Sequence, residues 1–129
     1  MIEYRVDPNL CNADLERLFS ATWTDDLPSD FSSVLAHSLA YIGAFTEDDE
    51  LIGFINLAWD GGVHAFLLDP TVDPAWQRRG IGKALVMRAI EQARLRGCTW
   101  LHVDYEARLE PFYAQCGFQP TQAGLVHLK

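Results

Sequence analysis

The apolar positions of this chain recur with two periods, one typical of strands and the other typical of helices. Residues that alternate between apolar and polar, or form a short apolar run between turn residues, predict strands. They occupy residues 2–6, 41–45, 51–57, 64–68 and 100–103, with two shorter segments at 118–121 and 125–128. The pattern predicts about seven strands, the last two closing as a hairpin.

Other segments carry apolar residues three or four positions apart, which is the spacing of one helix face. These predicted helices cover residues 12–22, 32–38, 81–93 and 110–115. Asn12 is the expected cap of the first helix, because its short polar side chain can accept a hydrogen bond from a free N–H. Gly97 is expected to end the third helix, since glycine adopts the left-handed conformation of a helix stop.

The order of these elements predicts a mixed α/β domain. The acidic tip at residues 47–50 joins two strands, as is typical of an antiparallel hairpin. The third helix connects the strands at 64–68 and 100–103, and such a strand–helix–strand unit makes its two strands parallel. The 129 residues show no linker or repeat, so we expect one domain over residues 1–129. Its sheet should be mostly antiparallel with one parallel pair.

Composition favours a globular protein of a reducing compartment. Hydrophobic residues make up 49% of the sequence, and no apolar run approaches the ~20 residues of a membrane span. The first residues lack the basic and apolar regions of a signal peptide. Three scattered cysteines match neither a disulfide framework nor the spacing of a zinc site. These features predict a cytoplasmic protein without a metal site or a membrane partner.

Charge is unevenly distributed along the chain. The net charge of −8 disfavours nucleic acid as a partner, yet residues 77–96 hold six basic side chains and one acidic side chain. Arg78 and Arg79 precede the third helix, so a solvated helix face does not account for them. Such a face does account for the others that follow on the helix: Arg88, Arg94 and Arg96. Cations gathered before a helix indicate an anionic ligand.

A glycine pair lies at the same place, between a predicted strand and the third helix. The turn consists of Gln77, Arg78, Arg79, Gly80, Ile81, Gly82 and Lys83. The first N–H groups of a helix have no internal acceptor, the helix dipole favours an anion there, and glycines let a diphosphate approach the main chain. A Walker A loop is absent, and a dinucleotide fingerprint needs glycine where Leu85 stands. The turn therefore predicts a phosphorylated ligand held without either nucleotide motif.

The turn and a second motif together resemble the GCN5-related N-acetyltransferases, the GNAT family. Residues 77–82 are similar to the family signature, which is Gln or Arg, two variable residues, Gly, one variable residue, and Gly or Ala. Residues 72–74, Val-Asp-Pro, match the Val-x-Pro that usually precedes it. Residues 112–118, Phe-Tyr-Ala-Gln-Cys-Gly-Phe, match the aromatic-Tyr-x-x-x-Gly-Phe element. The resemblance covers about residues 40–120. It implies acetyl transfer from acetyl-CoA to a small amine or a peptide amine, without a metal.

The resemblance also implies roles for individual residues. Backbone N–H groups and cations of the turn would hold the diphosphate of coenzyme A, and the strand before it would bind the pantetheine arm. This cofactor-binding set is Thr71, Val72, Gln77, Arg78, Arg79, Gly80, Ile81, Gly82 and Lys83. Tyr113 occupies the position of the general acid that protonates the departing thiolate, with core packing as its alternative role. Phe112 is expected to be the core residue beside it.

The general base is less clearly marked. Many family members carry a Glu in the fourth strand, where this chain has Leu68 with Asp69 beside it. Asp69 is therefore the first candidate for the base. Other candidates are Asp104, Glu106 and His64. His64 and His102 are otherwise expected to be structural residues of the sheet.

Two residues depart from the family pattern. Pro70 is expected to mark a bulge in the strand and cannot donate an N–H to the acyl carbonyl, so that role falls to Thr71 or Val72. Glu106 replaces an Asn that in the family helps to hold the cofactor. These departures keep two alternatives open: a non-catalytic acyl-CoA-binding or sensor module, and a partner-binding domain that uses no ligand.

The acceptor is the least defined part of the site. In the family it enters beside the first two helices and the strand tips, which here carry Asp25, Asp26, Asp30, Glu47, Asp48, Asp49, Glu50 and Asp60. These acids would attract a cationic amine or serve as ordinary surface charge. The candidates for an apolar wall are Trp23, Trp59 and Phe31. An edge strand at 125–128 would allow a homodimer.

Overall fold

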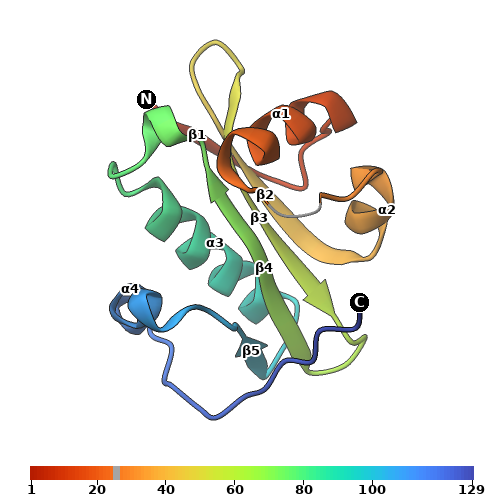
Figure 1. Cartoon of the computed structure of the whole chain (residues 1–129), viewed down its shortest axis with the longest axis vertical. Coiled ribbons are helices and arrows are strands. Elements are labelled where there is room, and N and C mark those ends of the chain that lie inside the picture. The colour runs from red at the N-terminus through yellow and green to blue at the C-terminus, as the bar shows by residue number, and fades with distance from the viewer. Residues whose placement is uncertain (25–26) are drawn as a thin grey trace.

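The computed structural model describes residues 1–24 and 27–129 and shows one twisted sheet between two layers of helices (Figure 1). Asp25 and Asp26, two acids of the predicted acceptor side, lie outside the described residues. The elements in chain order are β1 (Glu3–Val6), α1 (Asn12–Thr22), α2 (Phe31–Ala36), β2 (Ser38–Phe45), β3 (Leu51–Trp59), β4 (His64–Val72), the 3-10 turn η1 (Pro74–Trp76), α3 (Ile81–Leu95), β5 (Trp100–His102), the 3-10 turn η2 (Ala107–Leu109) and α4 (Glu110–Gln115).

The sheet has five strands in the order β1-β2-β3-β4-β5. Neighbours from β1 to β4 are antiparallel, whereas β4 and β5 are parallel, with His64 opposite Trp100. The parallel pair follows from the crossover through α3, since a tight hairpin can join only antiparallel strands. The predicted mixed α/β fold with one parallel strand–helix–strand unit and four helices is confirmed.

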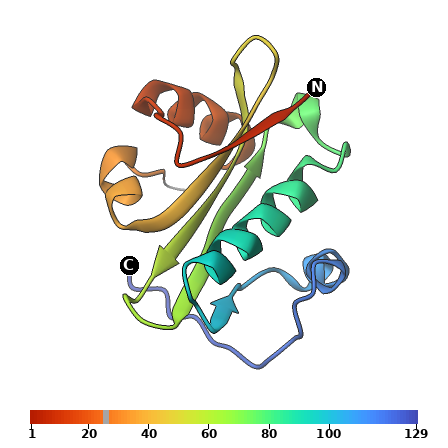
Figure 2. The ribbon, with the colours of Figure 1, turned by 180° about the vertical axis from the view of Figure 1, so that it is seen from behind.

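Each face of the sheet has its own core because side chains of a strand alternate between the two faces. On one face α3 packs against β2, β3 and β4, burying Leu85 and Val86 completely. On the other face α1 and α2 cover the sheet, with Phe19 of α1 packed edge-on against Phe31 and Phe54. Figure 2 shows α3 crossing the sheet on the side opposite to α1 and α2. The half of the sheet near β5 has no helix over its α1 face in either view.

The ends of the helices match the sequence prediction in one case and not in the other. Gly97 has φ of 85° and donates to the carbonyl of Arg94 at 3.1 Å, while Cys98 donates to Ala93 at 3.0 Å. This is the Schellman pattern, so the predicted helix stop is confirmed. The prediction that Asn12 caps α1 is wrong: Asn12 is inside the helix, and its side chain accepts the N–H of Phe31 at 2.8 Å. A tertiary contact has taken the oxygen that a cap would use.

Several strands extend beyond their apolar runs. β2 begins at Ser38, because the short α2 ends at Ala36 rather than at residue 38. β3 continues to Trp59, and β4 continues through a Pro-containing segment to Val72. Pairing with a neighbour extends these strands into polar positions that periodicity alone cannot assign.

The predicted closing hairpin does not form, and the prediction of about seven strands is wrong by these two. Residues 118–129 contain no helix or strand. Leu125, Val126 and Leu128 are 80%, 82% and 89% exposed, so their apolar side chains bury nothing. A four-residue apolar run becomes a strand only when another strand pairs with it, and this segment has no such partner among the described residues. No helix of the described ranges is long and apolar enough to cross a bilayer.

Candidate active site

The turn from β4 to α3 leaves the first N–H groups of α3 free. Gly80 directly precedes the helix with φ of 80°, a conformation that glycine adopts without strain. Ala84 donates its N–H to the Gly80 carbonyl at 3.0 Å, so the N–H groups from Ile81 to Lys83 have no acceptor within the helix. These donors and the positive end of the helix dipole favour an anion at this place.

Gly82, in the first turn of α3, lies between the end of β4 and α4. A Cβ on this residue would meet the side chains of Val72 and Phe112, each at 3.9 Å, which is an ordinary van der Waals distance. The protein therefore has room for alanine here, although glycine in a helix costs about 0.5–1 kcal/mol relative to alanine. Packing within the protein does not account for Gly82, whereas a ligand that approaches the main chain does.

Three exposed cations surround this turn. None of the ion pairs among the described residues involves Arg78, Arg79 or Lys83. Arg79 lies over the ring of Trp76 at 4.8 Å, which holds its guanidinium beside η1. The other cations of the basic stretch have partners within the protein: Arg88 over the ring of Tyr4, Arg94 beside Glu91, and Arg96 on the carbonyl of Leu39. The charges available to an anion are therefore those at the turn.

The end of β4 has a free edge. β5 pairs only with residues His64–Phe66, so the later residues of β4 have no strand partner on that side among the described residues. Asp73 donates its N–H to Ile52 on β3 at 2.8 Å, and successive residues of a strand alternate between its two edges. Val72 therefore turns its peptide groups to the free edge, where its carbonyl accepts from the Gln77 side chain at 3.0 Å. The N–H of Val72 remains there as a donor.

Asp69 and Pro70 form a bulge in β4. The register between β3 and β4 shifts at this point, so that both residues lie opposite Ile55 alone. The bulge that the sequence predicts at Pro70 is confirmed. Asp69 has φ of 55°, in the left-handed region. Asp69 is an exposed residue, but the atoms around its carboxyl partly desolvate it and raise its pKa, and such a carboxylate is a stronger base near neutral pH.

Tyr113 lies on α4 inside a cage of aromatic rings and is 3% exposed. Tyr105 stacks on its ring at 4.7 Å, while Phe112 and Phe118 approach it edge-on at 5.0 Å and 5.7 Å. Burial raises the pKa of the phenol above 10.0, so it stays protonated at neutral pH. No hydrogen bond joins the Tyr113 hydroxyl to another described residue. Every fully buried polar side-chain atom of the described residues has a hydrogen-bond partner, so this hydroxyl is not fully buried and reaches solvent.

The packing of these rings corrects one expectation. Phe112, predicted as the core residue of the pair, is only partly buried, and Tyr113 takes the core position. The ring of Phe112 instead lies toward Gly82 of α3. The charge of Lys83 opposes the rise that burial causes in the pKa of the Cys116 thiol directly after α4, which is a second sign that α3 and α4 lie side by side. The structure therefore brings the glycine turn and Tyr113 together.

The other candidate bases lie in three different settings. His64 Nδ1 and His102 Nε2 are 2.8 Å apart and join β4 to β5, with Phe66 stacked on His102 at 4.7 Å. Both histidines serve the sheet, as expected. Glu106 accepts a bond from Arg108 at 2.8 Å. The charge of Asp104 contributes to the raised pKa of Tyr113, which places Asp104 near the phenol.

The three aromatic residues predicted as an acceptor wall are separated. Phe31 is 2% exposed and belongs to the core with Phe19, so it is not a wall residue. Trp59 donates its indole N–H to Gly62 at 2.8 Å, at the end of β4 farther from the turn. Trp23, directly after α1, donates its indole N–H to the Thr71 hydroxyl at 2.9 Å and lies beside the bulge. Only Trp23 is next to Asp69.

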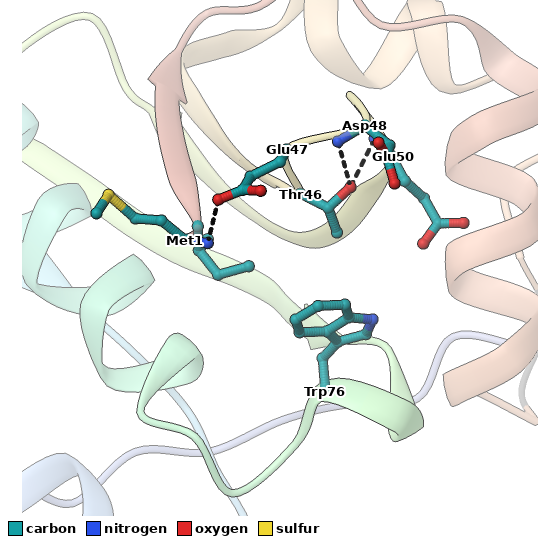
Figure 3. A pocket seen from close by; sticks show the side chains of 7 residues that line it. Met1, Thr46, Glu47, Asp48, Glu50 and Trp76 are labelled. Atoms are coloured by element: carbon teal, nitrogen blue, oxygen red, sulfur yellow. Dashed lines mark hydrogen bonds and ion pairs between the residues drawn. The ribbon is translucent and has the colours of Figure 1, made fainter.

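The acidic residues are also dispersed. A cavity of about 420 Å³ opens between the start of β1, the tip of the β2–β3 hairpin and η1 (Figure 3). Its lining includes Glu47, Asp48 and Glu50 together with Trp76, and none of the predicted catalytic or coenzyme-binding residues. Two other acids hold turns: Asp30 accepts the N–H of Ser32, and Asp60 accepts that of Gly62. The described residues contain no group of three metal-ligating side chains that could hold an ion.

The sequence did not predict one residue of the site, Tyr105, or the role of one side chain, that of Thr71. Tyr105 stacks on Tyr113, lies eight positions before it in the chain and follows the last strand. An aromatic residue at this spacing is the signal that could have identified Tyr105. The Thr71 side chain is 1% exposed and bonded to Trp23, whereas the sequence pointed only to its main chain. No local pattern marks a hydrogen bond between residues 48 positions apart.

Comparison with known proteins places the chain in a family. A family model described as the acetyltransferase (GNAT) family matches residues 10–118. A glucosamine 6-phosphate N-acetyltransferase of Oryza sativa subsp. japonica is 44% identical over 59 residues, which are 44% of this chain and 36% of that protein. A chloroplastic GCN5-related N-acetyltransferase of Arabidopsis thaliana is 32% identical over 74 residues, covering 57% of this chain and 38% of that protein. The chain thus spans little more than a third of the length of these curated relatives.

Solved structures show the same fold. A GNAT-family acetyltransferase of Streptococcus pneumoniae superposes with a TM-score of 0.81 at 24% identity, over 100% of both chains. A GNAT-family N-acetyltransferase of Escherichia coli, solved in complex with CoA, gives 0.77 at 15% identity, over 92% of this chain and 68% of that one. With the family model matched over most of its length, the chain belongs to the GNAT family of acetyltransferases.

Proposed function

We propose that this protein transfers an acetyl group from acetyl-CoA to a small primary amine or a peptide amine. The observation that carries the proposal is the position of Gly82. A Cβ there would touch Val72 at the end of β4 and Phe112 beside Tyr113, both at 3.9 Å. The free helix N–H groups, the free strand edge and the Phe112 ring that packs on Tyr113 thus lie around one residue that has no side chain.

The coenzyme would be held by main-chain groups and three cations. The N–H groups at the start of α3 face an anion, and Arg78, Arg79 and Lys83 supply positive charge without partners among the described residues. The N–H of Val72 at the free edge of β4 is the donor available to a pantetheine amide or to the acyl oxygen. Thr71 turns its peptide groups toward β3, so Val72 is the better candidate of the two predicted residues.

Acetyl-CoA would supply a thioester that an amine attacks. The bond from the amine nitrogen to the carbonyl carbon forms, the carbon–sulfur bond breaks, and coenzyme A leaves as a thiol. We propose that Tyr113 gives its proton to the sulfur and that Asp69 takes the proton which the amine loses. The raised pKa of Tyr113 keeps the phenol protonated, and the raised pKa of Asp69 improves the carboxylate as a base.

The acceptor is the open part of this proposal. Relatives from rice and from Trypanosoma brucei brucei are named glucosamine 6-phosphate N-acetyltransferases, so this amino sugar is the first compound to test. The acidic sequence argues for cationic amines as the second group. A panel with glucosamine 6-phosphate, polyamines, arylalkyl amines and peptides separates these classes.

The test measures thiol release from acetyl-CoA over this panel for wild type, Tyr113→Phe and Tyr105→Phe. Tyr105 is the matched control, because it stacks on Tyr113 and carries the same hydroxyl. We expect kcat to fall about 100-fold for Tyr113→Phe, the loss typical of a general acid, and far less for Tyr105→Phe. Equal turnover by Tyr113→Phe and wild type would reject Tyr113 as the acid. An unchanged melting temperature with coenzyme A would reject the ligand itself.

A second candidate function is a non-catalytic acyl-CoA-binding module. The observation that favours it is Pro70, which removes an N–H from the bulge beside the proposed base. This module would show a higher melting temperature with acetyl-CoA and no thiol release with any amine.

The three cysteines are free thiols, which supports the proposal of a cytoplasmic location.

A further inference from the structure

Trp23, Thr71 and Asp69 form a continuous hydrogen-bonded chain between α1 and the bulge of β4. The indole N–H of Trp23 donates to the Thr71 hydroxyl at 2.9 Å, and this hydroxyl donates to the main-chain carbonyl of Asp69 at 2.9 Å. The indole N–H can only donate and the carbonyl can only accept, so the single hydroxyl proton has one place to go. The direction of both bonds is therefore determined by the groups themselves.

We propose that Trp23 and Thr71 are positioning residues, which hold the bulge in the conformation that sets the place of the Asp69 carboxylate. The inference rests on the proposed function in giving that carboxylate a role as base. It extends that function by naming two residues that act through Asp69 and not on the substrate. They connect the last turn of α1 to the reacting end of β4.

The bulge requires such support because its backbone is unfavourable for two independent reasons. Asp69 has φ of 55°, a left-handed conformation that residues other than glycine adopt rarely, although aspartate tolerates it better than most. It also precedes Pro70, and the proline ring restricts the preceding residue to extended conformations. A strained residue persists only where its surroundings hold it. The Thr71 hydroxyl supplies that hold at the Asp69 carbonyl.

The tether is itself rigid at both ends. Thr71 is 1% exposed, so its side chain has no freedom to turn toward water. Trp23 follows α1 directly, and its main-chain N–H donates to the Phe19 carbonyl at 2.7 Å, which continues the helical bonding. Phe19 in turn is packed edge-on against two core rings. The position of α1 is thereby transmitted to the bulge through one indole.

The experiment compares Thr71→Val, which removes the hydroxyl at equal size, with Thr71→Ser, which keeps it, and with Trp23→Phe, which removes only the N–H donor and leaves a ring. Trp59→Phe is the matched control. Trp59 is 43% exposed against 39% for Trp23, and its indole N–H also donates a hydrogen bond, in this case to the main-chain carbonyl of Gly62 at the other end of β4.

The first measurement does not depend on activity. Carboxyl ¹³C NMR follows the titration of Asp69 in each variant. We expect the raised pKa of Asp69 to move toward its ordinary value in Thr71→Val and Trp23→Phe, because a relaxed bulge moves the carboxylate away from the atoms that now partly desolvate it. It should stay raised in Thr71→Ser and Trp59→Phe. An Asp69 titration that is the same in all five proteins overturns the inference.

The second measurement is acetyl transfer with the best amine of the panel. We expect kcat to fall about 10-fold in Thr71→Val and Trp23→Phe, with the pH–rate profile shifted as the titration is. The melting shift caused by coenzyme A should be unchanged, and Thr71→Ser should recover most of the rate. If wild type transfers no acetyl group, the proposed function fails while the NMR titration still tests the tether. Should Thr71→Val not fold, Trp23→Phe, which changes a half-exposed side chain, gives the same two readouts.

Discussion

Gly82 shows how a single residue can separate the needs of the fold from those of a ligand. The protein leaves room for a methyl group at Gly82, and alanine favours a helix over glycine by about 0.5–1 kcal/mol. We expect Gly82→Ala to melt at the same or a higher temperature than wild type. The methyl group would stand where the diphosphate approaches, so the melting shift caused by coenzyme A should largely disappear. Differential scanning fluorimetry with and without coenzyme A measures both.

Gly97→Ala is the matched control for this prediction. Gly97 has φ of 85° at the other end of α3, with no atom within 4 Å of a Cβ. Alanine there is strained in the left-handed region by about 1–2 kcal/mol. We expect a lower melting temperature and an intact response to coenzyme A, the reverse of Gly82→Ala. A full coenzyme response in Gly82→Ala would contradict a ligand at that main chain.

Asp69 carries a pH dependence whose sign follows from burial. Its folded-state pKa is raised, so its contribution to stability is complete below the ordinary pKa and is lost as the pH rises through the folded-state pKa. Asp69→Asn keeps a side chain that tolerates the left-handed conformation and removes the charge. We expect this variant to be at least as stable as wild type at pH 7, with the difference shrinking toward pH 4. Urea unfolding across that range measures it.

A less stable Asp69→Asn at pH 7 would be the contrary result. It would mean that the carboxylate is stabilised by a partner in the folded protein. The same variant should lose acetyl transfer if Asp69 is the base. The two readouts then move in opposite directions, as is common for a residue whose environment serves chemistry at the expense of stability.

At the scale of elements, β5 depends on a short connection to the sheet. Three residue pairs join it to β4, and the His64–His102 hydrogen bond at 2.8 Å, with Phe66 stacked on His102, adds a side-chain link. We expect His102→Ala to lower the free energy of unfolding by about 1 kcal/mol and to speed amide hydrogen exchange in β5. His37→Ala, which removes an exposed histidine directly after α2, is the control and should leave β5 exchange unchanged.

At the scale of the molecule, the chain ends in a segment that the sheet does not use. Leu125, Val126 and Leu128 are exposed, and β5 is an edge strand with no partner beyond it among the described residues. We propose that these two features meet in a homodimer. Sedimentation at micromolar concentration should show a dimer for the full chain and a monomer after deletion of residues 121–129. The melting shift with coenzyme A should survive the deletion, because the glycine turn lies on another element.

A full chain that sediments as a monomer would contradict the dimer proposal.

We also expect residues 1–129 to behave as a single domain. This requires one unfolding transition, seen alike by circular dichroism and by tryptophan fluorescence. Two separate transitions would divide the chain.

Features that depend only on neighbouring residues could be predicted from the sequence. The periodic apolar face of α3, its stop at Gly97, the β2–β3 hairpin and the glycine turn are all set within a few positions, where backbone sterics and helix or strand periodicity act. Pro70 marked the bulge for the same reason, because a missing N–H is a local property. These local signals were enough to predict where along the chain a candidate site lies.

Which groups meet depends on the three-dimensional fold. No local rule connects the residues of three contacts: the stack of Tyr105 on Tyr113, the hydrogen bond from Trp23 to Thr71, and the bond from the Phe31 N–H to Asn12, which prevents Asn12 from acting as a cap. The predicted closing hairpin shows the opposite case, a strand pattern without a partner. These contacts and the missing hairpin have one cause. A hydrogen-bonding group, a ring or a strand stabilises the fold only when a suitable partner lies opposite it, and the topology of the chain determines that partner.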